Sequence, residues 1–372
     1  MSFLKLLLVL VILVVFFLFI AQNSGYVEVS FLYQVYRMPL FVLLLLSFFI
    51  GFILPSLYFL LRETILKRKL SLIEKGLGEF SRGYIGKAGA ILDGLVKSFN
   101  GIGIIVIEAL RRQERSEDIR AYNSILPAVV GEILLRQGKD EAEGEFEKAL
   151  FQDEENLRAL KGLRDFYALR GNWQKALEYQ EKVLQLCERW EKDYQKRIKA
   201  EIMAKVYLEK GEEKLIEKAM DLSPTPFVYT VYLKYLLSQD RLRDAGKYWE
   251  KAISLKYHEE ILWNLLEDQA ALTKLFELIQ NKADYIHPDT LSMVYIRLNL
   301  FSKIKEMEER LSDTIKALMY SASSHRREDK YCLQSLWELL KPFECSCGKV
   351  YNKYEPVCFG CFVWGEIRLR RV

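Results

Sequence analysis

The first 61 residues are far more hydrophobic than the rest of the chain. Residues 6–27 carry no charge, and a second uncharged run covers residues 38–61. Each run is long enough to cross a hydrocarbon core, which needs about 20 helical residues. Gly51 and Pro55 lie inside the second run, and membrane helices tolerate both residue types. The pattern predicts a hairpin of two membrane-spanning helices.

The first run has a second interpretation as a cleavable signal peptide. Lys5 supplies the short basic region of such a peptide, but Phe19-Ile20-Ala21 places a bulky ring where cleavage requires a small residue. The second run favours the hairpin, because two spans account for both segments.

Basic residues indicate the orientation of this hairpin. The second run is followed by Arg62, Lys67, Arg68 and Lys69, opposed only by Glu63. The segment 22–39 between the runs carries only Glu28 and Arg37. Because basic flanks stay in the cytoplasm, we expect both ends of a two-pass protein to be cytoplasmic. Structural disulfides are rare in that compartment.

A repeat occupies the middle of the chain. Similar triplets recur at spacings of 34, 36 and 33 residues: Glu147-Lys148-Ala149, Glu181-Lys182-Val183, Glu217-Lys218-Ala219 and Glu250-Lys251-Ala252. The tetratricopeptide repeat has a period of about 34 residues. Tyr167, Gly171, Trp173 and Ala176 supply the aromatic, turn and small residues that this repeat requires. The sequence therefore predicts a mainly α protein with a tetratricopeptide-type α-solenoid.

The repeat weakens at both ends. Gly83-x3-Lys87-Ala88 has the spacing of Gly171-x3-Lys175-Ala176, which predicts a first repeat over residues 71–98 and a further helix over 101–113. From about 256 to 322 the pattern stays helical while the repeat decays.

Little in the sequence indicates catalysis. The three histidines, His258, His287 and His325, are far apart, and we find neither a phosphate loop nor a Ser-His-Asp arrangement. His287 precedes Pro288 and is expected at a helix boundary. We therefore expect no enzyme. The net charge of +4 is too small to indicate nucleic-acid binding.

Four of the six cysteines fall in the last 28 residues. Cys345, Cys347, Cys358 and Cys361 form two close pairs, and four thiolates on two turns can hold one Zn²⁺ tetrahedrally. We expect these four to be metal ligands, with iron as the alternative metal and redox-active or unliganded thiols as other possibilities. Cys187 and Cys332 are expected to be buried on helices.

The first pair is irregular. It reads Cys345-Ser346-Cys347-Gly348, whereas a standard knuckle has Cys-x-x-Cys-Gly. One residue is missing, so the geometry could be strained or a ligand could come from elsewhere. Cys332 and Glu344 are the reserve ligands.

Both ends of the chain resemble known families. Ala21-Gln22-Asn23, the β-prone stretch 26–31 and Pro39-Leu40 resemble the lipopolysaccharide assembly protein A domain over residues 1–70. The aromatic-flanked tail ending in Cys361-Phe362-Val363-Trp364 resembles the rubredoxin-like domain of the lipopolysaccharide assembly protein B family, and Asn172-Trp173-Gln174-Lys175-Ala176 resembles its repeats. The shortened first pair departs from this family. So do Val357 and Phe359 around Cys358, where the family has Cys-Pro.

The resemblance implies three domains: a two-helix transmembrane domain over residues 1–70, helical repeats over 71–322 and a rubredoxin-like zinc knuckle over 323–372. It implies a bacterial inner-membrane adaptor, not an enzyme, that regulates lipopolysaccharide biosynthesis by presenting a client to a membrane protease. The implied partners are a membrane AAA protease, the deacetylase of the lipid A pathway and lipopolysaccharide transport proteins, bound on the groove of the repeats.

Three alternative functions remain open. The repeats fit a general scaffold for another membrane assembly equally well. A rubredoxin-like domain can hold iron and carry electrons. Nucleic-acid binding through Arg368, Arg370 and Arg371 lacks support from any larger basic face.

Overall fold

The computed structural model describes residues 3–370 except 24, 32, 114 and 324–339. The chain divides into two compact units, Met1–Asp118 and Ile119–Val372. The domain boundaries expected from the sequence lie at residues 70 and 322, and residue 70 lies inside the continuous helix Leu40–Ser81.

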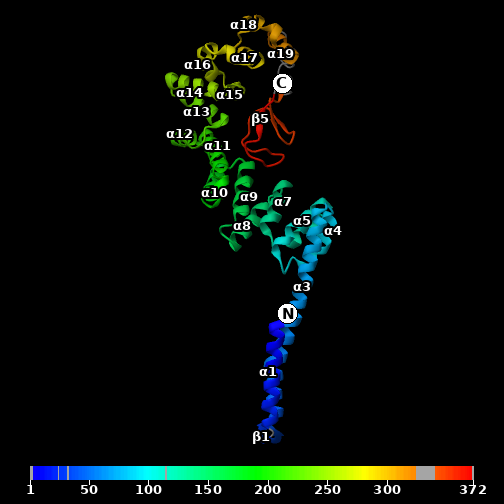
Figure 1. The fold of residues 1–372 in the computed structure, drawn as a ribbon. Coiled ribbons are helices and arrows are strands. Elements are labelled where there is room, and N and C mark those ends of the chain that lie inside the picture. Colours follow the sequence, from blue (N-terminus) through cyan, green and yellow to red (C-terminus); the bar gives the residue numbers. More distant parts are fainter. Residues whose placement is uncertain (1–2, 24, 32, 114, 324–339, 371–372) are drawn as a thin grey trace. The chain divides into compact units, whose positions relative to one another are not determined.

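The first unit begins with two apolar helical segments joined by a hairpin (Figure 1). Helix α1 covers Phe3–Gln22, and strands β1 (Tyr26–Phe31) and β2 (Gln34–Pro39) pair antiparallel, which confirms the β-prone stretch. Helix Leu40–Ser81 follows, and its length and apolar composition allow it to cross a membrane. Phe16 of α1 stacks on Phe48 with ring centroids 4.6 Å apart, so the two segments pack together.

The long helix changes its winding once. It consists of α2 (Leu40–Phe48), a π-helical turn (Phe49–Ile53) and α3 (Leu54–Ser81). Pro55 has no N–H to donate to the preceding turn, and the backbone N–H of Leu54 reaches back five residues to the carbonyl of Phe49. The wider turn accommodates the proline while the helix continues.

Close helix packing completes the first unit. Helices α4 (Ile85–Leu92) and α5 (Gly103–Arg112) follow α3, with short turns at Asp93–Leu95 and Asn100–Ile102 and a short helix α6 at Ser116–Ile119. A Cβ on Gly76 would lie 2.5 Å from Leu92 Cδ2, and one on Gly89 would lie 2.5 Å from Ala109 Cβ. Glycine therefore sets the distance between these helices. The helices expected over 71–98 and 101–113 are present.

The second unit is a stack of helical hairpins (Figure 1). The successive pairs are α7 (Pro127–Arg136) and α8 (Ala142–Gln152), α9 (Leu157–Leu169) and α10 (Trp173–Leu186), α11 (Lys192–Lys210) and α12 (Glu213–Leu222), α13 (Pro226–Ser238) and α14 (Leu242–Ser254), α15 (His258–Leu265) and α16 (Gln269–Gln280), and α17 (Pro288–Arg297) and α18 (Phe301–Lys305), followed by α19 (Asp313–Ser323). Short 3₁₀ turns lie at Arg120–Tyr122, Arg189–Glu191, Ala283–Tyr285 and Glu308–Arg310.

The repeated triplets explain this stack. Their last residues each lie on the second helix of a pair and are almost completely buried: Ala149, Val183, Ala219 and Ala252. Gly138, Gly171 and Gly211 have positive φ angles at the turns within three pairs, where a left-handed residue ends the first helix. Buried residues that recur every 33–36 positions, together with glycines at the turns, therefore produce the recurring hairpin.

A small three-stranded sheet follows the stack. Strands β3 (Phe343–Cys345), β4 (Val350–Tyr351) and β5 (Ile367–Leu369) pair antiparallel in the order β4-β3-β5. Phe343 and Ile367 are buried. We call residues 340–370, which contain this sheet and the four clustered cysteines, the cysteine module.

Two glycines provide a matched test of the packing in the stack. A Cβ on Gly162 of α9 would lie 2.2 Å from the fully buried Phe146 ring, whereas one on Gly144 of α8 meets no atom within 4 Å. We predict that Gly162→Ala lowers the free energy of unfolding by about 1–3 kcal/mol through overpacking. Gly144→Ala should leave it unchanged or raise it by about 0.5–1 kcal/mol, because alanine favours the helix. Denaturant unfolding of the full chain in detergent measures both, and equal effects would contradict this packing.

Candidate metal centre

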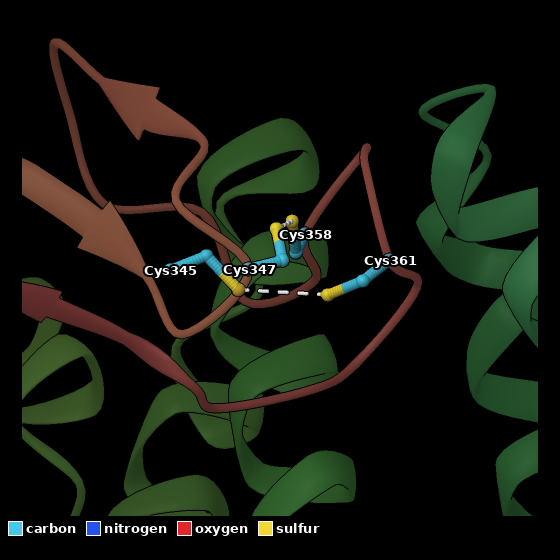
Figure 2. A group of neighbouring side chains, drawn as sticks. All are labelled: Cys345, Cys347, Cys358 and Cys361. Atoms are coloured by element: carbon cyan, nitrogen blue, oxygen red, sulfur yellow. Dashed lines mark hydrogen bonds between the residues drawn. The ribbon is translucent and has the colours of Figure 1, made fainter.

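The four clustered cysteines converge on one point (Figure 2). Their Sγ atoms all lie within 4.8 Å of one another. The Sγ atoms of Cys345 and Cys361 are 3.5 Å apart, and those of Cys347 and Cys358 are 3.6 Å apart. Tetrahedral Zn–S bonds of about 2.3 Å place neighbouring sulfurs about 3.8 Å apart. The cluster therefore fits a four-thiolate metal site.

The shortened first pair still delivers two sulfurs to this point. Cys345 ends strand β3, and its N–H donates to the carbonyl of Lys349 at 2.9 Å. The N–H of Gly348 donates back to the carbonyl of Cys345 at 2.8 Å, with Gly348 in the left-handed region at φ +85°. A tight hairpin turn thus brings Cys345 and Cys347 to the same side although one residue is missing.

The second pair lies on a turn of its own. The N–H of Cys358 donates to the carbonyl of Val363 at 3.0 Å, and the N–H of Phe362 donates to the carbonyl of Cys358 at 2.9 Å. A Cβ on Gly360 would lie 3.6 Å from the sulfurs of both Cys347 and Cys358. Glycine lets the backbone pass close to the sulfurs there.

Polar groups also surround the sulfurs. The N–H of Gly360 donates to Cys358 Sγ at 3.3 Å, and the hydroxyl of Tyr351 lies 3.0 Å from the same sulfur. Burial raises the pKa of Cys361 to about 12, and the neighbouring thiols add to this effect. Burial also tends to raise the pKa of Cys358, but the hydrogen bonds from Tyr351 and from backbone amides outweigh it and lower that pKa to about 6. Four crowded thiolates repel one another, and a divalent cation bound among them would supply the compensating charge.

The other expected residues lie elsewhere or outside the described residues. Glu344 does not belong to the cluster, and its neighbours on β3, Phe343 and Cys345, have side chains on the opposite face of the strand. Cys187 is buried at the end of α10, as expected, whereas Cys332 lies outside the described residues.

The two histidines with described positions lie at the starts of helices α15 and α17. His287 caps α17, its Nδ1 accepting a hydrogen bond from the N–H of Asp289 at 3.3 Å, which confirms the expected helix boundary. His258 lies 3.0 Å from the carbonyl of Tyr285 through Nε2. His325 lies outside the described residues.

The cysteine module is docked on the helix stack through Trp364. Its indole Nε1 donates to Asp165 Oδ1 at 2.8 Å, and the Arg164 guanidinium lies 5.1 Å from the centre of the ring. Arg164 is buried and also donates to Gln180 and Gln195 at 2.9 and 3.2 Å. Burial raises the pKa of Asp165, while Arg164 and the indole act against the rise. A hydrogen bond to a charged group contributes about 1.5–3 kcal/mol.

A second buried contact lies at Tyr354. Its hydroxyl donates to Glu201 Oε1 at 3.1 Å, and its ring stacks on Phe227 with centroids 5.3 Å apart. Glu201 is 1% exposed. Burial raises its pKa to about 7, although Arg197 and the hydrogen bonds from Thr225 and Tyr354 lower it.

All these contacts use one face of the stack. Residues contacting the module lie on α9, α11, α13 and α15, which are the first helices of four consecutive pairs: Asp165, Tyr194, Arg197, Glu201, Lys205, Phe227 and Asn264. Sequence reasoning missed them, because a charged residue on an amphipathic helix is normally assigned to solvent. The only available signal was Trp364, an aromatic residue placed just after the last cysteine.

A cavity of about 570 Å³ lies at the end of this face. It is lined by α15, the start of α17 and strand β5, with both Glu260 and Arg370 among its residues. Tyr285 at its edge is 66% exposed.

The metal content tests the site directly. We predict about one zinc per chain in purified full-length protein, and its loss together with thermal stability in the Cys358→Ser, Cys361→Ser double variant. Cys187→Ser, which changes a cysteine outside the cluster, should retain the metal. Elemental analysis and thermal unfolding measure both. Iron in place of zinc would support electron transfer, and a metal-free wild-type chain would contradict the site.

One comparison with known proteins identifies part of the chain. Residues 22–79 match the model of the lipopolysaccharide assembly protein A domain. No curated protein matches the chain significantly. The matched segment contains the hairpin β1–β2 and most of the helix Leu40–Ser81, which suggests membrane anchoring. The chain thus contains a lipopolysaccharide assembly protein A domain, followed by stacked helices and a C-terminal cluster of four cysteines.

Proposed function

We propose that this chain is a bacterial inner-membrane scaffold that regulates lipopolysaccharide biosynthesis. One observation carries the proposal: a lipopolysaccharide assembly protein A domain occurs in the same chain as a helix stack with a four-cysteine module docked on it. That combination unites the features by which the sequence resembles the assembly protein A and B families. We assign the stack to the tetratricopeptide type on the same grounds.

The proposed anchor crosses the membrane twice. Helix α1 and helix Leu40–Ser81 are both apolar and are joined by a short β-hairpin. The basic residues after the second span favour a cytoplasmic location for everything that follows. The first helix then also has its start in the cytoplasm.

In this proposal the scaffold presents a client enzyme to a protease. By resemblance, it holds the lipid A pathway deacetylase near a membrane AAA protease, which degrades the enzyme, and it contacts lipopolysaccharide transport proteins. The scaffold itself catalyses no reaction in this proposal. A Zn²⁺ held by Cys345, Cys347, Cys358 and Cys361 would act as a structural cross-link between the two turns.

The docked module reduces the surface of the helix stack on which a client can bind. It covers part of the face formed by α9, α11, α13 and α15, so a client must contact what remains. The cavity beside β5 offers both charge signs and the exposed ring of Tyr285. Exposed aromatic residues are common anchors at protein interfaces.

Affinity capture from bacterial membranes tests this proposal. We predict that the tagged full-length chain recovers the protease and the deacetylase, and that Tyr285→Ala reduces recovery of the deacetylase. Phe151→Ala is the matched control, because Phe151 is an exposed aromatic residue on α8 that does not line the cavity. Recovery of neither a protease nor any lipopolysaccharide enzyme would contradict the proposed function. Equal effects of the two variants would mean that the deacetylase does not bind at the cavity beside β5.

A further inference from the structure

Helix α3 carries an apolar stripe beyond the proposed membrane span. The stripe consists of Leu66, Leu70, Ile73, Leu77 and Phe80, at alternating spacings of four and three residues. Leu66, Leu70, Leu77 and Phe80 are 48, 52, 44 and 40% exposed, and Ile73 is half-buried. Ile65 and Leu72 are exposed as well but fall outside the stripe. At 1.5 Å per residue the stripe is about 21 Å long.

This spacing is the heptad pattern of a coiled coil. Leu70 and Leu77 take the a positions, while Leu66, Ile73 and Phe80 take the d positions. A neighbouring side of α3 packs on α4 through Gly76 and Leu92, so α4 leaves much of the stripe exposed. A contiguous apolar face of this kind on a water-soluble part of a protein marks an interaction surface.

The flanking charges fit a parallel pair of identical helices. In such a pair, a residue at g faces the e residue five positions later in the other chain. Lys69 at g would face Glu74 at e, a pair of opposite charges. Lys69 contacts the hydroxyl of Ser98 at 3.0 Å and keeps further N–H groups to donate. The like-charged pair Arg62 and Lys67 is offset by Glu63, which lies 2.8 Å from Lys67 in its own chain.

The membrane span would align the α3 helices of two copies, because α3 continues directly from that span. Leu40–Ser81 is a single helix, so the stripe continues directly from the proposed membrane span. Two copies inserted in one membrane have their helices parallel and at the same depth, which is the register that identical heptads require. Tethering to a surface also raises the effective concentration of one copy near another.

We propose that α3 pairs with α3 of a second copy of this chain through the stripe Leu66–Phe80, forming a parallel coiled coil at the membrane. A dimer of this kind places two helix stacks on one anchor. The proposal rests on α3 and on the membrane anchor of the proposed function, and it is independent of the client that the stack binds.

Cysteine cross-linking in membranes tests the register. Single cysteines are placed in the full-length chain at Leu70 and Leu77, which face the partner, and at the control positions Ser71 and Lys75, which take the b and f positions. Mild oxidation of membranes should give disulfide-linked dimers for Leu70→Cys and Leu77→Cys and none above the unsubstituted chain for Ser71→Cys and Lys75→Cys. Equal yields at all four positions would mean random collision and would overturn the proposal.

Charge insertion tests the stability of the pair. Leu70→Glu with Leu77→Glu should convert the detergent-solubilised dimer to a monomer in analytical ultracentrifugation, while Ile65→Glu with Leu72→Glu, an equally exposed apolar pair, should leave it dimeric. Circular dichroism confirms that each variant remains helical. A monomeric wild-type chain that also fails to cross-link in membranes would overturn the proposal. Cross-links from Leu70→Cys to a different protein would do so too, because another partner would then cover the stripe.

Discussion

The buried polar contacts between the C-terminal module and the helix stack are the constraint on which the second unit depends. Glu201 is buried inside the stack and Asp165 is largely covered there, where an ionised carboxylate without partners is costly. Their hydrogen-bond donors include Trp364 and Tyr354, which come from the far end of the chain. The stack therefore includes groups that its own repeats do not fully satisfy. Docking of the module supplies one hydrogen-bond donor to each of these two carboxylates.

The cluster of four cysteines and this docking are parts of one arrangement. Trp364 follows Cys361 by three residues, and Tyr354 lies between the two cysteine pairs. A cation held by the four thiolates would fix the turns that position both aromatic side chains. Loss of such a cation would free the turns to move apart, and Asp165 and Glu201 would lose the donors that come from the module while keeping Arg164 and Arg197. Metal binding in such a module is coupled to the folding of its surroundings.

Much of the fold could be predicted from the sequence, because its signals were periodic or compositional. The apolar runs predicted both N-terminal helices, and the triplets ending in Ala149 and Ala252 predicted the helical hairpins. The spacing of the cysteines predicted the cluster. The first pair has one residue, Ser346, between its cysteines instead of two, which suggested a strained ligand geometry, but the hairpin turn brings both sulfurs to the cluster. The docking residues could not be predicted, because Asp165 and Glu201 look like ordinary surface charges until a distant segment covers them.

Amide hydrogen exchange with and without a chelator tests this coupling most directly. In full-length protein in detergent, removal of the metal should speed exchange in the cysteine module and, at the same time, in α11 around Glu201 and in α9 around Asp165. Helices α4 and α5 belong to the other unit and should keep their exchange rates. Faster exchange confined to the cysteine module, with α9 and α11 unchanged, would contradict the claim that the metal site and the helix stack fold as one unit.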